Sequence, residues 1–307
     1  MVKHILVCDP LEPSALELLK RQQKIDVHYQ PDISPEELKK TIATYDAVIV
    51  RSRTTLRRDT LERATRLKVI GRAGTGLDNI DVDFARERGI QVLNTPGANA
   101  NAVAELTLIL MLMLARNIVP ALDSLKAGKP LKVKGIELQG KTLGLIGFGN
   151  IGRLVAQLAR GFGMGVLAHD PLIDPNQIPE ALRVVPLCSL DELLSQSNFV
   201  SLHVPLLEST RQLVNEGLLE RFKRGAYLVN TARADLIDDA AVLKALESGQ
   251  LAGYATDVHE AGEPLLAHRK VIATPHIGAS TGEAQRRAGE EIAALVLAAL
   301  PDQNGDL

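Results

Sequence analysis

The stretch Gly147-Phe148-Gly149-Asn150-Ile151-Gly152 decides the fold of this 307-residue chain. It has the pattern G-x-G-x-x-G, which is informative only when a strand precedes it and a helix follows it. The apolar run Thr142–Ile146 comes before it, and residues 153–160 (RLVAQLAR) place apolar side chains at helical spacing after it. A second strand-like run, Val166–His169, ends at Asp170, 18 positions after the last glycine. Together these features predict a strand–helix–strand unit that binds a dinucleotide.

Each position of the motif answers a separate physical demand. The first glycine permits a tight turn, the second lets the backbone approach a pyrophosphate, and the third lets the helix pack on the strand. The following helix offers unpaired N–H groups and the positive end of its dipole to the phosphates. Asp170 can accept both ribose hydroxyls and would repel a 2′-phosphate, so the expected cofactor is NAD rather than NADP.

Composition sets wider bounds. The length suits two modest domains, and 46% hydrophobic with 23% charged residues is ordinary for a globular protein. The formal net charge of −2 gives no indication of a nucleic-acid or membrane partner. The two cysteines, Cys8 and Cys188, are expected to be reduced core thiols. The N-terminus has no secretory pattern and the longest apolar stretch, Leu106–Ala115, is too short to cross a bilayer, so we expect a cytoplasmic protein.

Strand-like runs alternate with helical patterns along the whole chain. Apolar strands separated by helices predict parallel sheets covered on both faces. Because five such runs precede the glycine motif, an earlier α/β domain is expected before the dinucleotide domain. Those five runs are Ile5–Val7, Ile25–Val27, Ala47–Val50, Lys68–Ile70 and Ile90–Leu93. The runs after the first strand of the motif are Val166–His169, Arg183–Val185, Phe199–Leu202, Ala226–Val229, Gly253–Ala255 and Val271–Ala273.

A helix that begins near Asn99 is expected to join the two domains. From Ala102 to Ala115 it is apolar nearly all round, interrupted by Glu105 and Thr107. A helix that is hydrophobic on every face must be buried on every face. We therefore expect one side of it to pack against a second subunit in a homodimer, the alternative being a fully internal helix. The amphipathic segment Glu283–Leu300 predicts a last helix that can return to the first domain.

Three segments place a reactive side chain just beyond a strand-like run, where parallel sheets bind ligands. They are Tyr227–Arg233, Ala255–Pro264 and Val271–Ser280, and they supply an arginine, carboxylates and a histidine. A guanidinium can clamp a carboxylate with two hydrogen bonds. An imidazole can donate a proton to a carbonyl oxygen as hydride reaches the carbon, and a neighbouring carboxylate can orient that imidazole. This set of groups suits hydride transfer to and from a 2-hydroxy acid.

These segments also carry a family resemblance. The chain resembles the D-isomer-specific 2-hydroxyacid dehydrogenases in NTARADLID (230–238), TPHIGAST (274–281), the glycine motif and the long stretch over residues 71–108. The resemblance implies two doubly wound α/β domains. A flavodoxin-like, substrate-binding domain would comprise residues 1–98 and 284–307, and a Rossmann, NAD-binding domain would comprise residues 99–283.

The resemblance also implies roles for individual residues. Arg233 would clamp the substrate carboxylate, His276 would act as acid and base, and Glu263 would be the carboxylate partner of His276. The loop Gly74-Thr75-Gly76 would offer backbone N–H groups to the substrate. The implied cofactor contacts are Thr75, Gly147, Gly149, Asn150, Ile151, Gly152, Asp170, His203, Val204, Pro205, Thr231, Ala232, Arg233, Asp257, His276, Gly278 and Ala279.

Two departures from the family pattern lie in one loop. This chain has one residue more than is usual between Asp257 and the pair Glu263-Pro264, and His259 replaces the customary apolar aromatic residue. Glu260 is therefore a rival to Glu263, which we favour because it directly precedes the proline. His259 and Glu260 lack a second ligand pair at suitable spacing, so no metal is expected.

Arginines beyond two early strand-like runs bear on the substrate. Arg51, Arg53 and Arg72 would suit a substrate with a second anionic group such as a phosphate, although arginines at strand ends are also common in structural ion pairs. The expected pair is D-3-phosphoglycerate and 3-phosphohydroxypyruvate, with glyoxylate, hydroxypyruvate or another 2-oxo acid as alternatives. An NAD-sensing, corepressor-like binding protein is the alternative of another class. Because the chain ends just past its last helix, no appended regulatory domain is expected.

Overall fold

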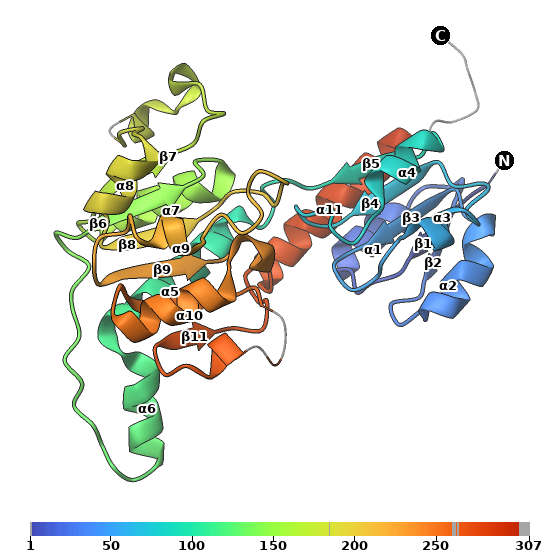
Figure 1. The fold of residues 1–307 in the computed structure, drawn as a ribbon. Coiled ribbons are helices and arrows are strands. Elements are labelled where there is room, and N and C mark those ends of the chain that lie inside the picture. The colour runs from blue at the N-terminus through green and yellow to red at the C-terminus, as the bar shows by residue number, and fades with distance from the viewer. Residues whose placement is uncertain (1, 184, 260–261, 263, 301–307) are drawn as a thin grey trace. The chain divides into compact units, whose positions relative to one another are not determined.

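The computed structural model of the chain describes residues 2–183, 185–259, 262 and 264–300 (Figure 1). The chain divides into two compact units. Unit 1 comprises Met1–Ala100 and Ala279–Leu307, and unit 2 comprises Asn101–Gly278. The sequence predicts these boundaries slightly differently, after residues 98 and 283.

Unit 1 is built on a five-stranded parallel sheet in the order β2-β1-β3-β4-β5. This is the flavodoxin-like order of doubly wound sheets. The strands are β1 (Lys3–Val7), β2 (Ile25–Tyr29), β3 (Ala47–Val50), β4 (Val69–Arg72) and β5 (Gln91–Asn94). Apolar side chains on both faces of these strands make the sheet a buried layer.

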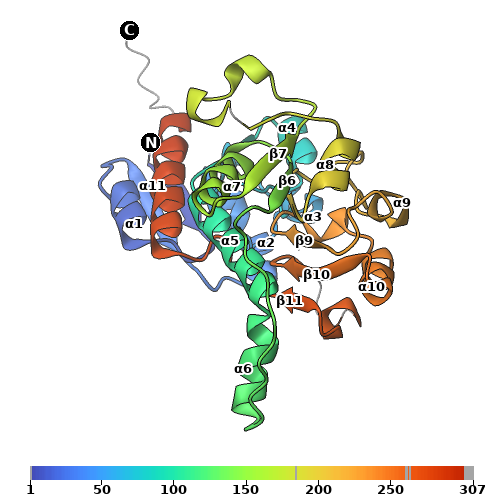
Figure 2. The same cartoon turned by 90° about the vertical axis from the view of Figure 1, so that its left-hand side faces the viewer.

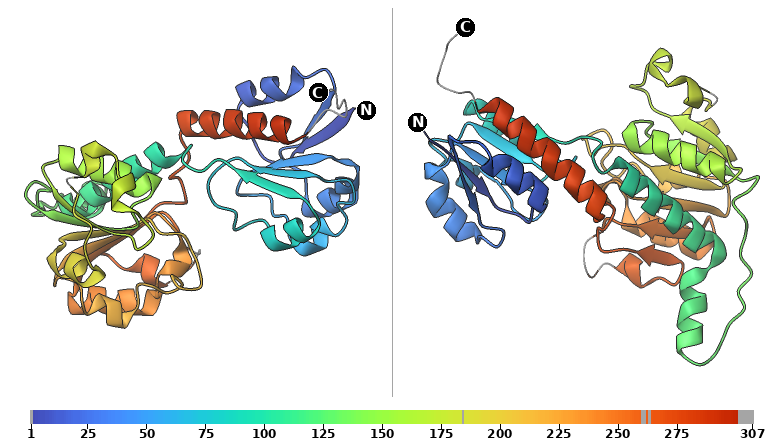
Figure 3. Two further views of the ribbon diagram at one scale, coloured as in Figure 1. Left: turned by 90° about the horizontal axis from the view of Figure 1, so that it is seen from above. Right: turned by 180° about the vertical axis from the view of Figure 1, so that it is seen from behind.

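Helices cover both faces of the unit 1 sheet. On the face of Ile5 and Val7 lie α1 (Pro13–Lys20) and α11 (Gly282–Ala299), and the last helix packs beside α1 on β4 and β5 (Figure 3). The approach is close, because a Cβ on Gly71 of β4 would lie 2.5 Å from Val296 Cγ2 of α11. On the opposite face, buried Leu6 and Cys8 belong to a second core. Its helices are α2 (Pro35–Thr41), α3 (Arg58–Leu61) and α4 (Val82–Glu87), with a 3₁₀ turn at Ile42–Thr44.

Unit 2 is built on a six-stranded parallel sheet in the order β11-β10-β9-β8-β6-β7. Its strands are β6 (Thr142–Ile146), β7 (Gly165–His169), β8 (Phe199–Leu202), β9 (Ala226–Asn230), β10 (Leu251–Thr256) and β11 (Val271–Ala273). Two all-parallel sheets with interleaved helices confirm the predicted fold class.

The strand predicted at Arg183–Val185 was wrong. Arg183 lies in a turn and Val185 in a bend, and the pairing is reduced to an isolated parallel bridge between Ala168 and Leu187. The physical reason is Pro186, which has no N–H to donate and restricts the residue before it. Its carbonyl still accepts a hydrogen bond from Ala168 N at 3.0 Å, and Cys188 N donates to Ala168 O at 2.9 Å, so the segment stays attached to β7 at this bridge.

Helices also cover both faces of the unit 2 sheet. On one face α5 (Ala100–Arg116) and α7 (Asn150–Gly161) pack on the side chains of Leu143 and Leu145. The other face is covered by α8 (Leu190–Gln196), α9 (Glu216–Leu219) and α10 (Asp239–Ser248). These helices contribute Leu193, Leu218 and Val242 to the core on that side. Short 3₁₀ turns lie at Pro175–Gln177, Glu180–Leu182, Ala234–Leu236 and Pro264–Ala267.

Much of α5 is buried within its own unit, and one face of the helix reaches the surface at Glu105 and Ile109. Leu110 and Met111 are fully buried and share a core with Phe148 and Val155 of the same unit. A large apolar side chain of α5 that does reach the surface is Ile109, at 50% exposure. The helix is therefore mostly but not fully internal, and its packing against a second subunit stays a prediction.

Exposed apolar side chains also lie on α6 (Ile118–Lys126), which leaves the body of unit 2 (Figures 1 and 2). None of its residues is buried, and Leu122 and Leu125 are 49% and 64% exposed. No single helix of the described residues is long and apolar enough to span a membrane. Taken together, α5 and α6 would be long and apolar enough, but the two helices meet at a bend of 66°.

Candidate active site

The predicted site residues of unit 2 lie at one edge of its sheet. All six strands are parallel, so their carboxyl ends lie at the same edge, and each of them leads into a segment that the sequence analysis singled out. These segments are the glycine turn after β6, Asp170 after β7, His203–Pro205 after β8, Thr231–Arg233 after β9, Asp257 after β10 and Thr274–Ala279 after β11. This is the edge at which open α/β sheets bind ligands.

The glycine turn joins β6 to α7 as the motif predicts. Gly147 has φ of 98°, and a Cβ there would lie 2.7 Å from the backbone of His203. A Cβ on Gly152 would lie 2.3 Å from Gly147 O. At Gly149, by contrast, a Cβ would meet nothing within 4 Å, although this residue is the N-cap of α7. The outer two glycines are thus demanded by the protein's own backbone, whereas the middle one opens onto free space at a helix N-terminus.

Asp170 is anchored beside this turn. Its carboxylate accepts hydrogen bonds from Phe148 N at 2.8 Å and from Leu172 N at 3.0 Å. A carboxylate has about four lone-pair sites, so capacity for two further donors remains. The carboxylate is therefore held next to the glycine turn, where ribose hydroxyls would be recognised.

The strand order reverses at β6, since the chain first runs to β7 and then returns to β8 on the other side. Gly147 and His203 face each other at this switch point, the position where doubly wound folds hold their ligands. The ring of His203 is within 2.9 Å of Ser201 Oγ through Nε2. Burial lowers the pKa of His203 to about 3, so the imidazole is neutral at physiological pH and suits a positioning role.

Arg233 follows β9 in a loop that Asn230 organises. Asn230 is fully buried, its Oδ1 accepts from Ala232 N at 3.0 Å, and its Nδ2 donates to Arg233 O at 2.8 Å. The half-buried Arg233 guanidinium donates through Nη1 to Ala232 O at 2.7 Å. Thr231 joins the loop to α5 through a 3.0 Å contact between its Oγ1 and that of Thr107. From the sequence Asn230 received no role of its own, although an amide directly after a buried strand was the available signal.

His276 has left-handed backbone geometry, with φ of 54°, which is uncommon outside glycine. Asp257 holds this turn in place. The buried carboxylate of Asp257 accepts from Thr274 Oγ1 at 2.6 Å, from Ile277 N at 2.8 Å and from Gly278 N at 2.7 Å. These bonds bracket the exposed side chain of His276. Strained residues of this kind persist only where the surroundings fix them, and they concentrate at functional sites.

The loop between Asp257 and His276 contains the two candidate partner carboxylates. Glu260 and Glu263 both lie outside the described residues. Within the described part of the loop, His259 Nε2 is 3.2 Å from Thr274 O. The histidine that replaces an apolar aromatic residue therefore contacts the backbone of the His276 turn.

The predicted substrate residues of unit 1 lie at the carboxyl edge of its sheet. Arg53 contacts two carboxylates, with Nε 3.3 Å from Asp9 Oδ1 and Nη1 3.2 Å from Asp32 Oδ1. The Arg51 guanidinium donates to Pro10 O at 3.3 Å, and its backbone N–H donates to Asp9. Arg53 therefore makes structural ion pairs within this unit, the alternative stated above for arginines at strand ends.

The loop after β4 carries the remaining predicted contacts. Gly74 has φ of 140°, a conformation favourable to glycine, and Arg72 Nη1 donates to Ala73 O at 3.5 Å. Thr75 is held by Asn94 Nδ2, which donates to its carbonyl at 2.7 Å, and its hydroxyl donates to Asn99 Oδ1 at 3.0 Å. Gly76 completes the loop and is partly exposed.

The match to known proteins is decisive for the family. Residues 108–278 match the family model described as "D-isomer specific 2-hydroxyacid dehydrogenase, NAD binding domain". The chain belongs to this family. A hydroxypyruvate reductase from Thermotoga maritima is 48% identical over 295 residues, which cover 93% of this chain and 94% of that protein.

Further D-2-hydroxyacid dehydrogenase relatives are similar to this chain. A D-3-phosphoglycerate dehydrogenase from Methanocaldococcus jannaschii is 45% identical over 299 residues, or 95% of this chain but only 56% of its own length. The NAD⁺-bound structure of a 3-phosphoglycerate dehydrogenase from Entamoeba histolytica has a TM-score of 0.84 at 29% identity, covering 100% of this chain and 97% of the other. The chain thus spans about half the length of the first of these phosphoglycerate dehydrogenases.

Membership of this family makes the protein an NAD-dependent oxidoreductase, and the geometry of unit 2 fits that cofactor. The open space at Gly149, the uncapped start of α7 and the anchored carboxylate of Asp170 are the features that a pyrophosphate and an unphosphorylated ribose require.

Proposed function

We propose that this D-2-hydroxyacid dehydrogenase interconverts D-3-phosphoglycerate and 3-phosphohydroxypyruvate with NAD as the hydride carrier. The observation that carries the reaction class is the common strand edge of unit 2. Arg233 after β9 and His276 after β11 flank β10 at the same edge as the glycine turn and Asp170. A carboxylate clamp and an acid–base group beside a dinucleotide turn suit a 2-hydroxy acid.

The residue roles follow from their chemistry. The glycine turn and the start of α7 would hold the pyrophosphate, Asp170 the adenosine ribose, and the segments after β8 and β9 the rest of the cofactor. Bound nicotinamide supplies or accepts the hydride. Arg233 would bind the substrate carboxylate through its guanidinium and so orient the adjacent carbonyl. His276 would donate a proton to the carbonyl oxygen during reduction and accept it during oxidation.

Two further residues would support His276. We propose Glu263 as the carboxylate that orients its imidazole, with Glu260 as the rival. We assign Asp257 to positioning as well as to cofactor contact, because three of its about four lone-pair sites are used by the His276 turn.

The proposed substrate rests on the unit 1 cations. Arg51, Arg53 and Arg72 lie at the carboxyl edge of the sheet and are proposed to bind the phosphate, with the loop over residues 74–76 binding the carboxylate. Hydroxypyruvate is the second candidate. It is favoured by the contacts of Arg53 with Asp9 and Asp32, and by similarity to a hydroxypyruvate reductase over nearly its full length.

The wider assignments are proposals of the same kind. We propose unit 1 as the substrate-binding domain, a place in serine biosynthesis, a cytoplasmic location and a homodimer formed through the helix around residues 102–115 in unit 2. The exposed apolar side chains of Ile109 and α6 support a second copy of this chain as the partner, because large apolar groups are costly to leave in water.

The test is NADH oxidation by the purified protein with four substrates in parallel: 3-phosphohydroxypyruvate, hydroxypyruvate, glyoxylate and 2-oxoglutarate. We expect the highest kcat/KM for the phosphorylated substrate. Arg233→Ala should lower kcat/KM by roughly 10²–10⁴-fold, since it removes two charge-assisted hydrogen bonds to the substrate.

The matched control is Arg211→Ala, which removes another arginine of unit 2 that is ion-paired to Asp235 at 3.2 Å. It should leave kcat/KM within about twofold. Preference for hydroxypyruvate would select the second candidate. Tight NADH binding without turnover of any substrate would refute the enzymatic proposal and support the sensor alternative.

A further inference from the structure

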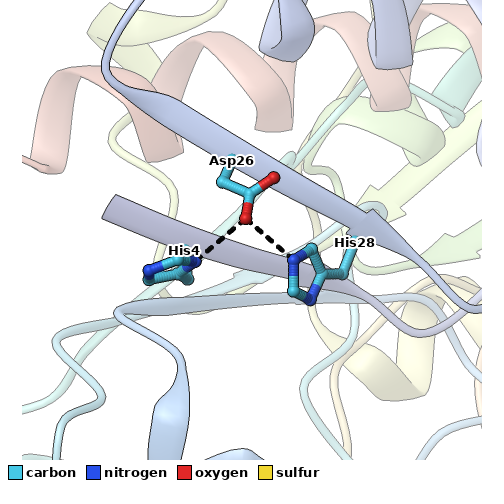
Figure 4. A group of neighbouring side chains, drawn as sticks. All are labelled: His4, Asp26 and His28. Atoms are coloured by element: carbon cyan, nitrogen blue, oxygen red, sulfur yellow. Dashed lines mark hydrogen bonds and ion pairs between the residues drawn. The ribbon is translucent and has the colours of Figure 1, made fainter. Parts of the chain in front are cut away.

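A cluster of three potential metal ligands lies on unit 1 and includes none of the predicted site residues. His4 is on β1, and Asp26 and His28 are on β2 (Figure 4). The strands are parallel and His4 pairs directly with Asp26 in the register. Because side chains alternate between faces along a strand, Asp26 and His28 share the face that His4 also occupies. The sheet itself thus brings together residues that are 22 and 24 positions apart.

The donor atoms are close enough for one small cation. Asp26 Oδ2 is 3.1 Å from His4 Nδ1 and 2.9 Å from His28 Nε2, and the three donor atoms lie within 4.8 Å of one another. Tetrahedral bonds of about 2.0–2.1 Å would put neighbouring ligand atoms about 3.3 Å apart. Small side-chain movements from the present positions would therefore satisfy a metal ion.

A buried tyrosine supports the geometry of His28. Tyr45 Oη lies 2.8 Å from His28 Nδ1, and the two rings meet edge to face at 5.3 Å and 89°. Tyr45 is only 4% exposed, so its position is fixed by the core. If Nδ1–H donates to the hydroxyl oxygen, Nε2 presents its lone pair toward Asp26. Metal-binding histidines generally have such a partner on the second ring nitrogen, which sets the tautomer.

The cluster is also accessible. The side chains of His4, Asp26 and His28 are 33%, 47% and 41% exposed, so an ion could enter and water could complete its coordination. Among the described residues, this is the group of three such side chains whose ligand atoms all lie within 4.8 Å of one another, close enough to share one ion. One strand away, Asp46 fixes β1 by accepting from His4 N at 2.8 Å.

We propose that His4, Asp26 and His28 form a binding site for a divalent cation of the zinc class. Two imidazole nitrogens and one carboxylate oxygen suit Zn²⁺, Co²⁺ or Ni²⁺ better than Mg²⁺ or Ca²⁺, which prefer oxygen ligands. The ion would join the edge strand β2 to its neighbour β1. This role is independent of the proposed dehydrogenase reaction, because none of the three residues belongs to the predicted active site.

The experiment uses the full chain without an affinity tag, after treatment with a chelator. Titration with ZnCl₂ should reach saturation at one ion per chain, and CoCl₂ should produce the visible absorption of a bound Co²⁺ ion. Zinc should raise Tm by a few degrees, since a ligand that binds only the folded state stabilises it. The imidazole NMR signals of His4 and His28 should shift with zinc.

Asp26→Asn and His28→Gln should each abolish saturation, and Tyr45→Phe should weaken binding by about 10-fold or more through loss of the supporting hydroxyl. The matched control is His268→Gln, which removes a partly buried histidine of unit 2 and should bind zinc as the parent does. Failure of the parent protein to saturate below about 1 mM zinc would overturn the proposal. So would unchanged binding in Asp26→Asn and His28→Gln. Because the NMR shifts are measured on the parent protein, the result does not depend on folding of the variants.

Discussion

At the scale of single residues, buried polar residues hold the backbone of the two side chains proposed to react. Asp257 fixes the left-handed turn of His276, and Asn230 fixes the loop of Arg233. The residues proposed to react could be selected from the sequence, because arginine and histidine beyond a strand have recognisable chemistry. The supporting roles of Asn230 and Asp257 could not be predicted in the same way, because their hydrogen bonds form only after β9, β10 and β11 are aligned.

His203 provides a pH-dependent test at this scale. Its folded pKa of about 3 lies below the ordinary value of 6.5, so the folded protein keeps it neutral while the unfolded chain takes up a proton. Stability should therefore fall as the pH drops from about 6.5 toward about 3, and this residue should have no effect above about pH 7. Between pH 7 and pH 5 we expect a loss of about 1–2 kcal/mol from this group in urea unfolding.

His203→Gln should remove that part of the pH dependence, whereas His268→Gln should keep it. Equal slopes for the parent and His203→Gln would show that the imidazole can be protonated in the folded protein, contrary to the expectation from its burial.

At the scale of elements, the strand–turn–helix unit of β6 and α7 formed as expected because its demands are local. The strand at Arg183–Val185 failed for an equally local reason, the proline that follows it. For α5 the apolar pattern correctly predicted that most of the helix is buried. The pattern gave no information about which parts of the protein cover the helix. Those parts belong largely to its own unit.

The glycine turn makes a prediction that separates folding from cofactor binding. Gly152→Ala should destabilise the fold by about 1–3 kcal/mol, because its Cβ would lie 2.3 Å from a backbone oxygen. Gly149→Ala should leave the free energy of unfolding nearly unchanged, since a Cβ there meets nothing within 4 Å. It should nevertheless weaken NADH binding by roughly 10–100-fold, because the methyl group would occupy the approach to the pyrophosphate.

Urea unfolding and NADH fluorescence titration would measure the two quantities. NADH affinity of Gly149→Ala equal to that of the parent would contradict the proposed position of the pyrophosphate.

At the scale of the whole molecule, the proposed homodimer depends on surface that unit 2 leaves uncovered. Replacing Leu122 and Leu125 of α6 together by glutamate should convert a dimer into a monomer, because charges would replace apolar groups at the interface. Sedimentation velocity would measure the mass. Phe162→Glu, at a 45% exposed site elsewhere on unit 2, is the control and should remain dimeric. A monomeric parent protein, or a dimeric double variant, would refute this interface.

The sequence by itself determined the parallel α/β class, most strand positions, the dinucleotide turn and the strand ends that bear Arg233 and His276. These features follow from hydrophobic periodicity, from the conformational freedom of glycine and from the edge rule of parallel sheets, all of which act within short segments. Tertiary structure alone decided the internal position of α5, the bracing of His276 by Asp257 and the meeting of His4 with Asp26 and His28. Each of these depends on strand register or packing between distant segments, and no local pattern in a single sequence specifies those contacts.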